Sequence, residues 1–159
     1  MTRIPGAPGV RIVGTGSAVP ERRLTNDDLS RMVDTSDEWI VQRTGIRERR
    51  VSDPSKEGTF TLNRDALKNA LDASGMKGSD LDLIIVGTCT QEMSCPSVAC
   101  RVAGEVGAVG AGAFDVVAAC SGFVVGLITA TQFIRGGAHR NILVVGGDAL
   151  SRYVDWRDR

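Results

Sequence analysis

Four short apolar runs, rich in β-branched residues, constrain the fold of this chain more than any other feature of its sequence. They are typical of strands and lie at residues 10–14, 83–87, 113–117 and 141–146. The last three barely alternate between apolar and polar residues, which is the pattern of strands covered on both faces, as in a parallel sheet between helices. The sequence therefore predicts an α/β fold.

Helices are expected before and between these strands, with ordinary capping residues at their ends. They are predicted at residues 26–32, 36–43, 60–74, 96–106 and 121–135. The helix at 60–74 has an apolar stripe and a charged opposite side, so it is expected at a surface. The helix at 121–135 has almost no polar side and is expected to be buried between layers.

Composition excludes several classes of function. The chain has 159 residues, of which 42% are hydrophobic, which suffices for one domain with a buried core. Its 19 Lys and Arg balance 19 Asp and Glu, so its net charge does not favour binding to nucleic acid or to an anionic membrane. No apolar run reaches the roughly 20 residues of a membrane span, and residues 1–11 lack the apolar stretch of a secretion signal. A cytoplasmic protein is expected.

The chain has four cysteines, which are Cys89, Cys95, Cys100 and Cys120. They form no CxxC pair and are accompanied by a single histidine, so no metal site is expected, and in a reducing compartment the thiols should stay free. Cys89 ends a strand and Cys100 lies in a helix, so both are expected to be structural. His139 follows two glycines at a helix end and is expected to be a surface turn residue.

Cys120 lies where an expected strand runs into the start of the apolar helix. The thiolate is the reactive form of cysteine, and free backbone N–H groups and the positive end of a helix dipole both favour it. The same N–H groups can receive an oxyanion after attack on a thioester. Spacing alone favours the alternative that Cys120 is a small buried hydrophobe. A thiol redox role is disfavoured, because no second cysteine lies near Cys120 in the sequence.

Long motifs along the chain resemble those of β-ketoacyl-acyl-carrier-protein synthase III. They are Gly14-Thr-Gly-Ser, Asp34-Thr-Ser-Asp-Glu-Trp-Ile-Val-Gln-Arg-Thr-Gly-Ile-Arg-Glu-Arg, Cys95-Pro-Ser-Val-Ala-Cys, Ala113-Phe-Asp-Val-Val-Ala-Ala-Cys-Ser-Gly-Phe and Leu143-Val-Val-Gly-Gly-Asp. The resemblance implies a thiolase-like fold, in which residues 1–159 form the N-terminal βαβαβαββ half of a layered αβαβα architecture. The C-terminal half is expected to be missing from this chain.

The resemblance also implies an acyltransferase that starts type II fatty acid synthesis. Cys120 would accept an acetyl or other short acyl group from acyl-coenzyme A, which is a substrate, and no cofactor is expected. A carbanion formed from malonyl-acyl-carrier protein, with loss of CO2, would then attack the acyl-enzyme and give a β-ketoacyl product. The implied partners are acyl-coenzyme A, malonyl-acyl-carrier protein and a second copy in a homodimer.

A second group of candidate residues concerns the coenzyme. Trp39 and Arg43 stand four apart in an expected helix and share a face, so an indole and a guanidinium could hold an adenine and a phosphate. The alternative is that Trp39 packs and Arg43 merely stacks on it. The resemblance assigns both residues, with Thr35 beside them, to the nucleotide end of coenzyme A. It assigns Arg159 to the other side of the adenine.

Two further implications of the resemblance concern what this chain lacks. At Cys95 the family often has a bulky residue, commonly Phe, that crosses the dimer interface and caps the partner's acyl pocket, so the smaller cysteine leaves acyl specificity open. The family completes its active site with His and Asn from the second half, so this chain alone is expected to be inactive. It is also expected to be poorly soluble, because a buried helix and a sheet face would be uncovered. The alternatives are a starter-unit synthase or acyltransferase of secondary metabolism, and a noncatalytic scaffold half.

Overall fold

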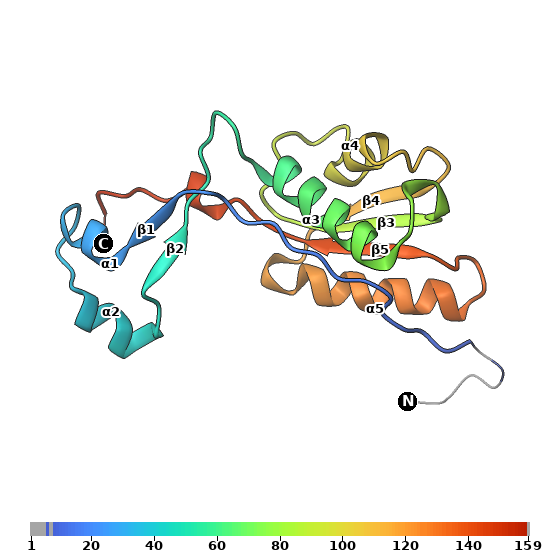
Figure 1. Ribbon diagram of the computed structural model, residues 1–159, viewed down its shortest axis with the longest axis horizontal. Helices are drawn as coiled ribbons and strands as arrows, with labels where there is room; N and C mark the ends of the chain where they lie inside the picture. Colours follow the sequence, from blue (N-terminus) through green and yellow to red (C-terminus); the bar gives the residue numbers. More distant parts are fainter. Residues whose placement is uncertain (1–5, 7, 159) are drawn as a thin grey trace. The chain divides into compact units, whose positions relative to one another are not determined.

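The computed structural model describes residue 6 and residues 8–158, which form two compact units (Figure 1). Unit 1 comprises the described residues of Met1–Ala18 and Thr59–Asp148, and unit 2 comprises those of Val19–Gly58 and Ala149–Arg159. The expected single domain over residues 1–159 stays a prediction. Each unit is described below by itself.

Unit 1 is built on a parallel sheet of three strands in the order β4-β3-β5. The strands are β3 (Leu83–Gly87), β4 (Gly112–Val116) and β5 (Ile142–Gly146). Strand β3 is central, and its residue Leu83 lies opposite Gly112 of β4 on one side and Ile142 of β5 on the other. The three predicted strands and their parallel pairing are confirmed to within one residue at each end.

The fourth predicted strand, at residues 10–14, is wrong, because this segment forms no strand ladder. It runs as extended chain along helix α3 (Thr59–Ser74). The contact is close: a Cβ atom added to Gly14 would lie 2.7 Å from the carbonyl oxygen of Ala70, and the Asn69 side chain donates a hydrogen bond to the Ser17 carbonyl at 2.9 Å. Contact with a helix therefore takes the place of the expected pairing with the sheet.

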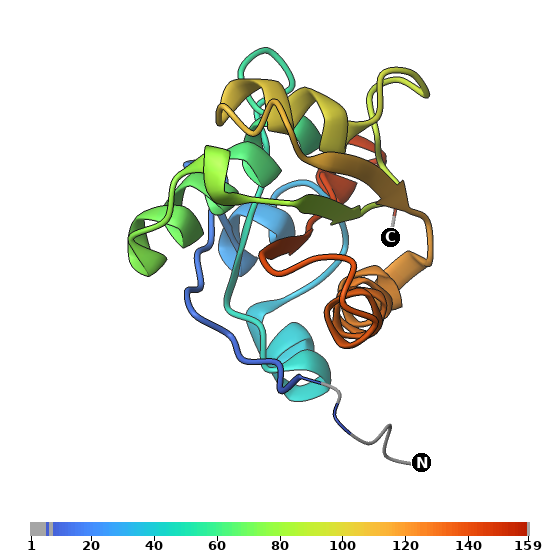
Figure 2. The ribbon, with the colours of Figure 1, turned by 90° about the vertical axis from the view of Figure 1, so that its right-hand side faces the viewer.

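Helices cover both faces of the sheet. Helices α3 and α4 (Val98–Glu105) pack on one face and α5 (Gly122–Arg135) packs on the other (Figures 1 and 2). The side chains of β3 are buried on both faces: Ile84 belongs to the cluster shared with α3 and α4, and Ile85 belongs to a smaller cluster with α5. This burial on both faces explains why β3 lacks an alternating sequence.

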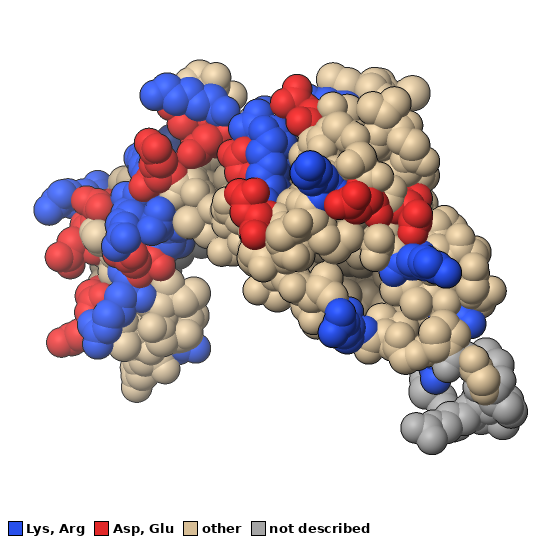
Figure 3. Space-filling view, turned by 45° about the vertical axis from the view of Figure 1, so that its right-hand side comes forward, with Lys and Arg blue, Asp and Glu red and all other residues tan. Residues whose placement is uncertain are grey.

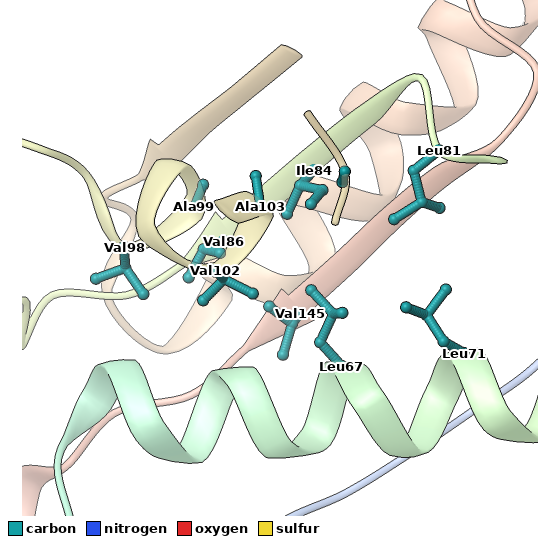
Figure 4. Close-up of a cluster of buried hydrophobic side chains, with 11 residues drawn as sticks. Leu67, Leu71, Leu81, Ile84, Val86, Val98, Ala99, Val102, Ala103 and Val145 are labelled. Carbon is teal, nitrogen blue, oxygen red and sulfur yellow. The ribbon is translucent and has the colours of Figure 1, made fainter. Parts of the chain in front are cut away.

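The main core lies between the sheet and helices α3 and α4. The cluster contains Leu67 and Leu71 of α3, Val98 and Val102 of α4, and Val86 of the sheet (Figure 4). All five side chains are at least 93% buried. Burial of each contributes roughly 1.5–3 kcal/mol, so this cluster is the principal stabilising feature of unit 1.

Helix α5 differs from its prediction. Its small residues Gly122, Gly126 and Ala130 are buried against the sheet, whereas Val124 and Ile128 are 55% and 58% exposed. The expected burial of this helix between two layers is therefore found on the side of the sheet, and its other side is exposed among the described residues. The reason is that glycine and alanine allow one side of α5 to approach the sheet, while its larger apolar residues lie on the other side.

No described helix is long and apolar enough to cross a membrane.

Unit 2 contains two short strands that the sequence did not indicate, β1 (Arg23–Thr25) and β2 (Glu48–Arg50), which pair antiparallel. They were missed because three-residue strands with mostly charged residues have no apolar alternation to detect. The predicted helices are confirmed as α1 (Asn26–Ser30) and α2 (Asp37–Thr44). The predicted caps are also confirmed, since Thr25 forms a capping box with α1 and Ser36 accepts a hydrogen bond from the Trp39 backbone.

Polar contacts hold unit 2 together. Asn26 is 1% exposed, and its side chain donates to Asp37 at 2.7 Å and to the Ile46 carbonyl at 2.8 Å. Its amide oxygen accepts a hydrogen bond from Arg49 at 2.7 Å. Charges of both signs are interleaved over the surface of this unit, whereas unit 1 shows large uncharged areas in the same view (Figure 3). Unit 2 is therefore organised around a buried amide, and the apolar residues buried in it, Leu24, Ile40, Val51 and Ala149, are few.

Candidate active site

Cys120 lies in a single 3-10 turn, Ala119–Ser121, that joins strand β4 to helix α5. The turn is closed by hydrogen bonds from the Ser121 backbone to the Ala118 carbonyl at 3.1 Å and from the Gly122 backbone to Ala119. The Cys120 side chain is exposed. Its position just before the apolar helix is the predicted one, and its exposure argues against a small residue buried in a core.

The backbone before Cys120 is strained. Ala119 has a φ of 45°, in the left-handed region that residues other than glycine seldom adopt. Such strain costs about 1–3 kcal/mol and persists only where the surrounding structure imposes it. The sharp change of direction places the thiol ahead of the helix.

Close glycine contacts fix the start of α5 against the ends of the strands. A Cβ atom added to Gly122 would lie 3.1 Å from the Cα atom of Gly87, the last residue of β3. A Cβ atom added to Gly146, at the end of β5, would lie 2.7 Å from the Cβ atom of Phe123. The thiol is thus held at the carboxyl edge of the parallel sheet, where open α/β sheets bind their ligands.

Asp148 organises the chain that follows β3. Its carboxylate accepts hydrogen bonds from the Thr88 hydroxyl at 2.8 Å, the Cys89 backbone N–H at 2.8 Å and the Thr90 hydroxyl at 3.1 Å. Burial opposes ionisation of this group, but these hydrogen bonds outweigh it and lower the pKa of Asp148 below its usual value. An ionised carboxylate therefore lies beside the segment that carries Cys89.

Cys89 is an exposed neighbour of Cys120. Desolvation raises the pKa of the Cys89 thiol above its ordinary value, and the charge of Asp148, a hydrogen bond to that carboxylate and the proximity of Cys120 add to the effect. Sequence spacing missed this pair, because the parallel pairing of β3 with β4 brings together two residues that are far apart along the chain. The expectation concerned distance along the sequence, whereas strand pairing carries Cys89 and Cys120 to the same edge of the sheet.

The predicted coenzyme residues Thr35, Trp39 and Arg43 lie in unit 2. The Arg43 guanidinium carbon stands 4.8 Å from the centroid of the Trp39 ring, so the two side chains share a helix face as predicted. Trp39 is 40% exposed, and Thr35 is half-buried just before the Ser36 cap. This geometry fits both coenzyme binding and the packing alternative. Arg159 lies outside the described residues.

Three further candidate residues, Cys95, Cys100 and His139, have other surroundings than Cys89 and Cys120. Cys95 is exposed in the segment between β3 and α4. Cys100 is also exposed, and its sulfur contacts the Ala113 carbonyl at 3.5 Å, in keeping with a structural role. His139 packs edge-on against Phe133 with ring centroids 5.2 Å apart. Among the described residues, no three His, Cys, Asp or Glu side chains gather in a cluster suited to a metal ion.

Comparison with known proteins places this geometry in a family. The family model described as 3-oxoacyl-[acyl-carrier-protein] synthase III matches residues 114–159. The β-ketoacyl-[acyl-carrier-protein] synthase III of Caldanaerobacter subterraneus subsp. tengcongensis is 53% identical over 148 residues, which are 93% of this chain and 44% of that protein. The enzyme of the same name from Synechococcus elongatus is 52% identical over 100% of this chain and 47% of its own length. Over 93–100% of its residues, the chain is thus similar to members of the β-ketoacyl-acyl-carrier-protein synthase III family.

Solved structures show the same similarity to synthase III enzymes. The 3-oxoacyl-[acyl-carrier-protein] synthase III of Aquifex aeolicus VF5 matches with a TM-score of 0.91 and 46% identity, over 95% of this chain and 48% of that one. The priming β-ketosynthase of the R1128 polyketide pathway matches with a TM-score of 0.92 and 34% identity, over 99% and 47%. The predicted thiolase-like α/β fold is confirmed. The chain spans about half the length of the curated relatives it matches.

Proposed function

We propose that this chain is the acyl-accepting half of an enzyme that starts fatty acid synthesis, with Cys120 as its nucleophile. The observation that carries the proposal is the exposed Cys120 thiol at the start of helix α5, on the carboxyl edge of the parallel sheet. The family assignment supports the same position, because the match to the family model covers residues 114–159.

The proposed first step is transfer of an acyl group to sulfur. The Cys120 sulfur attacks the thioester carbonyl of acyl-coenzyme A, a new C–S bond forms, and coenzyme A leaves as its thiolate. Backbone N–H groups near the start of α5 would receive the negative charge on the carbonyl oxygen. In the second step, a carbanion from malonyl-acyl-carrier protein, formed with loss of CO2, attacks the acyl group on Cys120 and releases a β-ketoacyl product.

The nucleotide end of coenzyme A is assigned to unit 2. The stacked pair of Trp39 and Arg43 offers an aromatic surface and a cation, which are the groups that recognise adenine and phosphate. The family resemblance adds Thr35 and Arg159 to the residues proposed to bind the nucleotide. The proposal is supported by the stacking of Trp39 with Arg43 and by the sequence motif that contains them.

The chain by itself is proposed to be inactive in condensation. The family resemblance places the His and Asn that assist loss of CO2 in a second half, and His139 is engaged with Phe133. A homodimer is part of the same proposal, with Cys95 at the dimer interface as a small cap on the partner's acyl pocket. A cytoplasmic location is proposed with it.

A second candidate function is that of a starter-unit synthase. The match to the priming β-ketosynthase of the R1128 pathway, at a TM-score of 0.92, favours it, as does the small side chain of Cys95. The two candidates share the step at Cys120 and differ in the acyl group that they prefer. Rates of acyl transfer from acetyl-coenzyme A and from longer or branched acyl-coenzyme A substrates distinguish them.

The test of the proposed function uses a chimera. Residues 1–159 are joined to the second half of the Caldanaerobacter relative, incubated with isotope-labelled acetyl-coenzyme A, and digested for mass spectrometry. The label is expected on Cys120 and absent in Cys120→Ser, while the control Cys100→Ser keeps it. A folded chimera with label on another residue, or with none, contradicts the proposal. Condensation by residues 1–159 alone contradicts their proposed inactivity.

A further inference from the structure

Two cysteines lie together at the carboxyl edge of the sheet in unit 1. Strands β3 and β4 are parallel neighbours with Gly87 opposite Val116, and the Thr88 backbone donates a hydrogen bond to the Val116 carbonyl at 3.1 Å. Cys89 follows the first strand and Cys120 follows the second. Both residues are therefore carried to the same edge by the pairing of their strands.

The start of helix α5 brings the two residues closer. A Cβ atom on Gly122 would lie 3.1 Å from the Cα atom of Gly87, so the backbones touch at this point. Cys89 is two residues after Gly87 and Cys120 is two residues before Gly122. A residue of extended chain advances about 3.3 Å, so each cysteine lies within about 7 Å of this contact along the chain.

Both thiols are accessible, and one of them is held in place. The Cys89 and Cys120 side chains are exposed. Asp148 accepts a hydrogen bond from the Cys89 backbone at 2.8 Å, which fixes the segment that carries this thiol. Cys120 sits in the turn before α5, which is closed by its own hydrogen bonds. An oxidant from solvent can thus reach the pair.

We propose that Cys89 and Cys120 form a redox pair, in which oxidation of Cys120 by hydrogen peroxide ends in a reversible disulfide with Cys89. This pair is a modification site that does not depend on acyl transfer. The disulfide would occupy the sulfur that accepts the acyl group and would shield it from irreversible oxidation.

The chemistry balances in two steps. The Cys120 thiolate attacks one oxygen of hydrogen peroxide, an S–O bond forms, the O–O bond breaks and hydroxide leaves, so the sulfur loses two electrons and the peroxide gains them. The Cys89 sulfur then attacks the Cys120 sulfur, an S–S bond forms and the S–O bond breaks. The departing hydroxide takes the Cys89 proton and leaves as water. A dithiol reverses the reaction by thiol–disulfide exchange.

The surroundings of Cys89 disfavour oxidation of its own sulfur by peroxide. Desolvation and the neighbouring Asp148 carboxylate raise the pKa of the Cys89 thiol. Peroxide reacts with the thiolate form, so Cys89 is protected from direct oxidation and remains reduced. Its thiol is then available when Cys120 has been oxidised.

Cys95 and Cys100 provide internal controls, because they are also exposed. Cleavage at Lys77, Glu92, Arg101 and Glu105 places Cys89 and Cys120 on two separate peptides, and Cys95 and Cys100 together on a third. Trypsin combined with a glutamyl endopeptidase gives residues 78–92 with Cys89, 93–101 with Cys95 and Cys100, and 106–135 with Cys120. A disulfide between any two of these peptides is identified by its mass.

The experiment treats the 159-residue chain with hydrogen peroxide, in native buffer and in urea. Free thiols are blocked at acid pH before digestion. In native buffer we expect the 78–92 peptide linked to the 106–135 peptide as the dominant product, and its loss on treatment with dithiothreitol. In urea the selectivity is expected to disappear, because it depends on the fold.

Variants supply the decisive comparison. In Cys89→Ser, Cys120 is expected to proceed to sulfinic and sulfonic acid, several-fold more than in the parent chain. Cys100→Ser should behave as the parent does, and Cys89→Ala repeats the test with a different side chain. Over-oxidation of Cys120 to the same extent with and without Cys89 overturns the proposal. So does a native product that links Cys120 to the 93–101 peptide, or one whose pattern matches that in urea.

Discussion

The two units of this chain are stabilised in different ways. Unit 1 buries a continuous apolar cluster between a parallel sheet and helices α3 and α4. Unit 2 is organised by Asn26 and Arg49, whose side chains bond to each other and to backbone carbonyls of the same unit. The comparison teaches that the proposed nucleophile belongs to the unit with an extended apolar core, whereas the proposed coenzyme residues belong to the unit organised by polar contacts.

The two units can be followed separately in solution. Both tryptophans of the chain, Trp39 and Trp156, lie in unit 2, so tryptophan fluorescence reports on that unit. The two longest helices, α3 and α5, and the three-stranded sheet lie in unit 1, so far-UV circular dichroism is dominated by this unit. Substitutions in one unit should therefore move one signal more than the other.

The largest effect is expected from truncation in the core of unit 1. Ile84 is 0% exposed, so Ile84→Ala should lower the free energy of unfolding by roughly 3–4 kcal/mol through lost burial and a residual cavity. Urea unfolding followed by circular dichroism measures the change. Ile128→Ala is the control, because Ile128 is 58% exposed and its removal should cost less than about 0.5 kcal/mol. An equal loss of unfolding free energy in the two variants would show that Ile128 on α5 is as well buried as Ile84 in the core.

A smaller effect is expected from the polar centre of unit 2. Asn26→Ala removes two donated hydrogen bonds and the acceptor for Arg49, which should cost roughly 2–3 kcal/mol. The fluorescence transition should shift to lower urea concentration more than the circular dichroism transition does. Glu48→Gln is the control, because the exposed ion pair of Glu48 with Arg23 at 2.9 Å is worth about 1 kcal/mol or less. A change confined to the dichroism signal would contradict the division into two units.

A comparable or smaller effect is expected where β3 meets α5. Gly87→Ala places a methyl group against the Gly122 backbone, 2.5 Å from its carbonyl carbon, and should destabilise unit 1 by roughly 1–3 kcal/mol. Gly104→Ala is the control, because nothing lies within 4 Å of its added methyl group and alanine favours a helix by up to about 1 kcal/mol. Thermal unfolding should therefore shift in opposite directions in the two variants. Unaltered stability in Gly87→Ala would mean that the contact is loose.

Lowering the pH should remove the contribution of Asp148 to the stability of unit 1. The folded pKa of this carboxyl is lowered, because its hydrogen bonds outweigh the opposing effect of burial. Its contribution to stability is therefore complete above the unfolded value of about 3.9 and is lost as the pH falls through the folded value. In Asp148→Asn the loss of stability below about pH 4 should be shallower than in the parent chain. Parallel stability curves for the two proteins between pH 6 and pH 3 would contradict this role.

The sequence predicted most of unit 1, because its strands are short apolar runs and its helices carry ordinary caps. Leu83–Gly87 is the clearest case, since a strand buried on both faces has no polar residue to obscure its pattern. The prediction at residues 10–14 failed, because apolar composition indicates that a segment is buried somewhere but not which element covers it, and here the segment runs along α3. For the helix predicted at residues 121–135, the expected burial is found on the side of the sheet only.

The candidate site was predicted in part. Cys120 was located by the junction of a strand and an apolar helix, which is a local signal. Its neighbour Cys89 was missed, because their proximity arises from strand pairing across many residues. The contribution of Asp148 was missed for the same reason, since its partners Thr88 and Thr90 follow a different strand.

The most direct test of the central claim is the relative reactivity of the four cysteines. The reduced chain is treated with limiting iodoacetamide at neutral pH, and the rate of alkylation at each thiol is measured by peptide mass spectrometry. Because Cys120 is exposed at the start of helix α5, we predict that it is alkylated faster than Cys89, Cys95 or Cys100, and that urea removes the difference. Alkylation of Cys120 no faster than that of Cys95 or Cys100 in native buffer would contradict the claim.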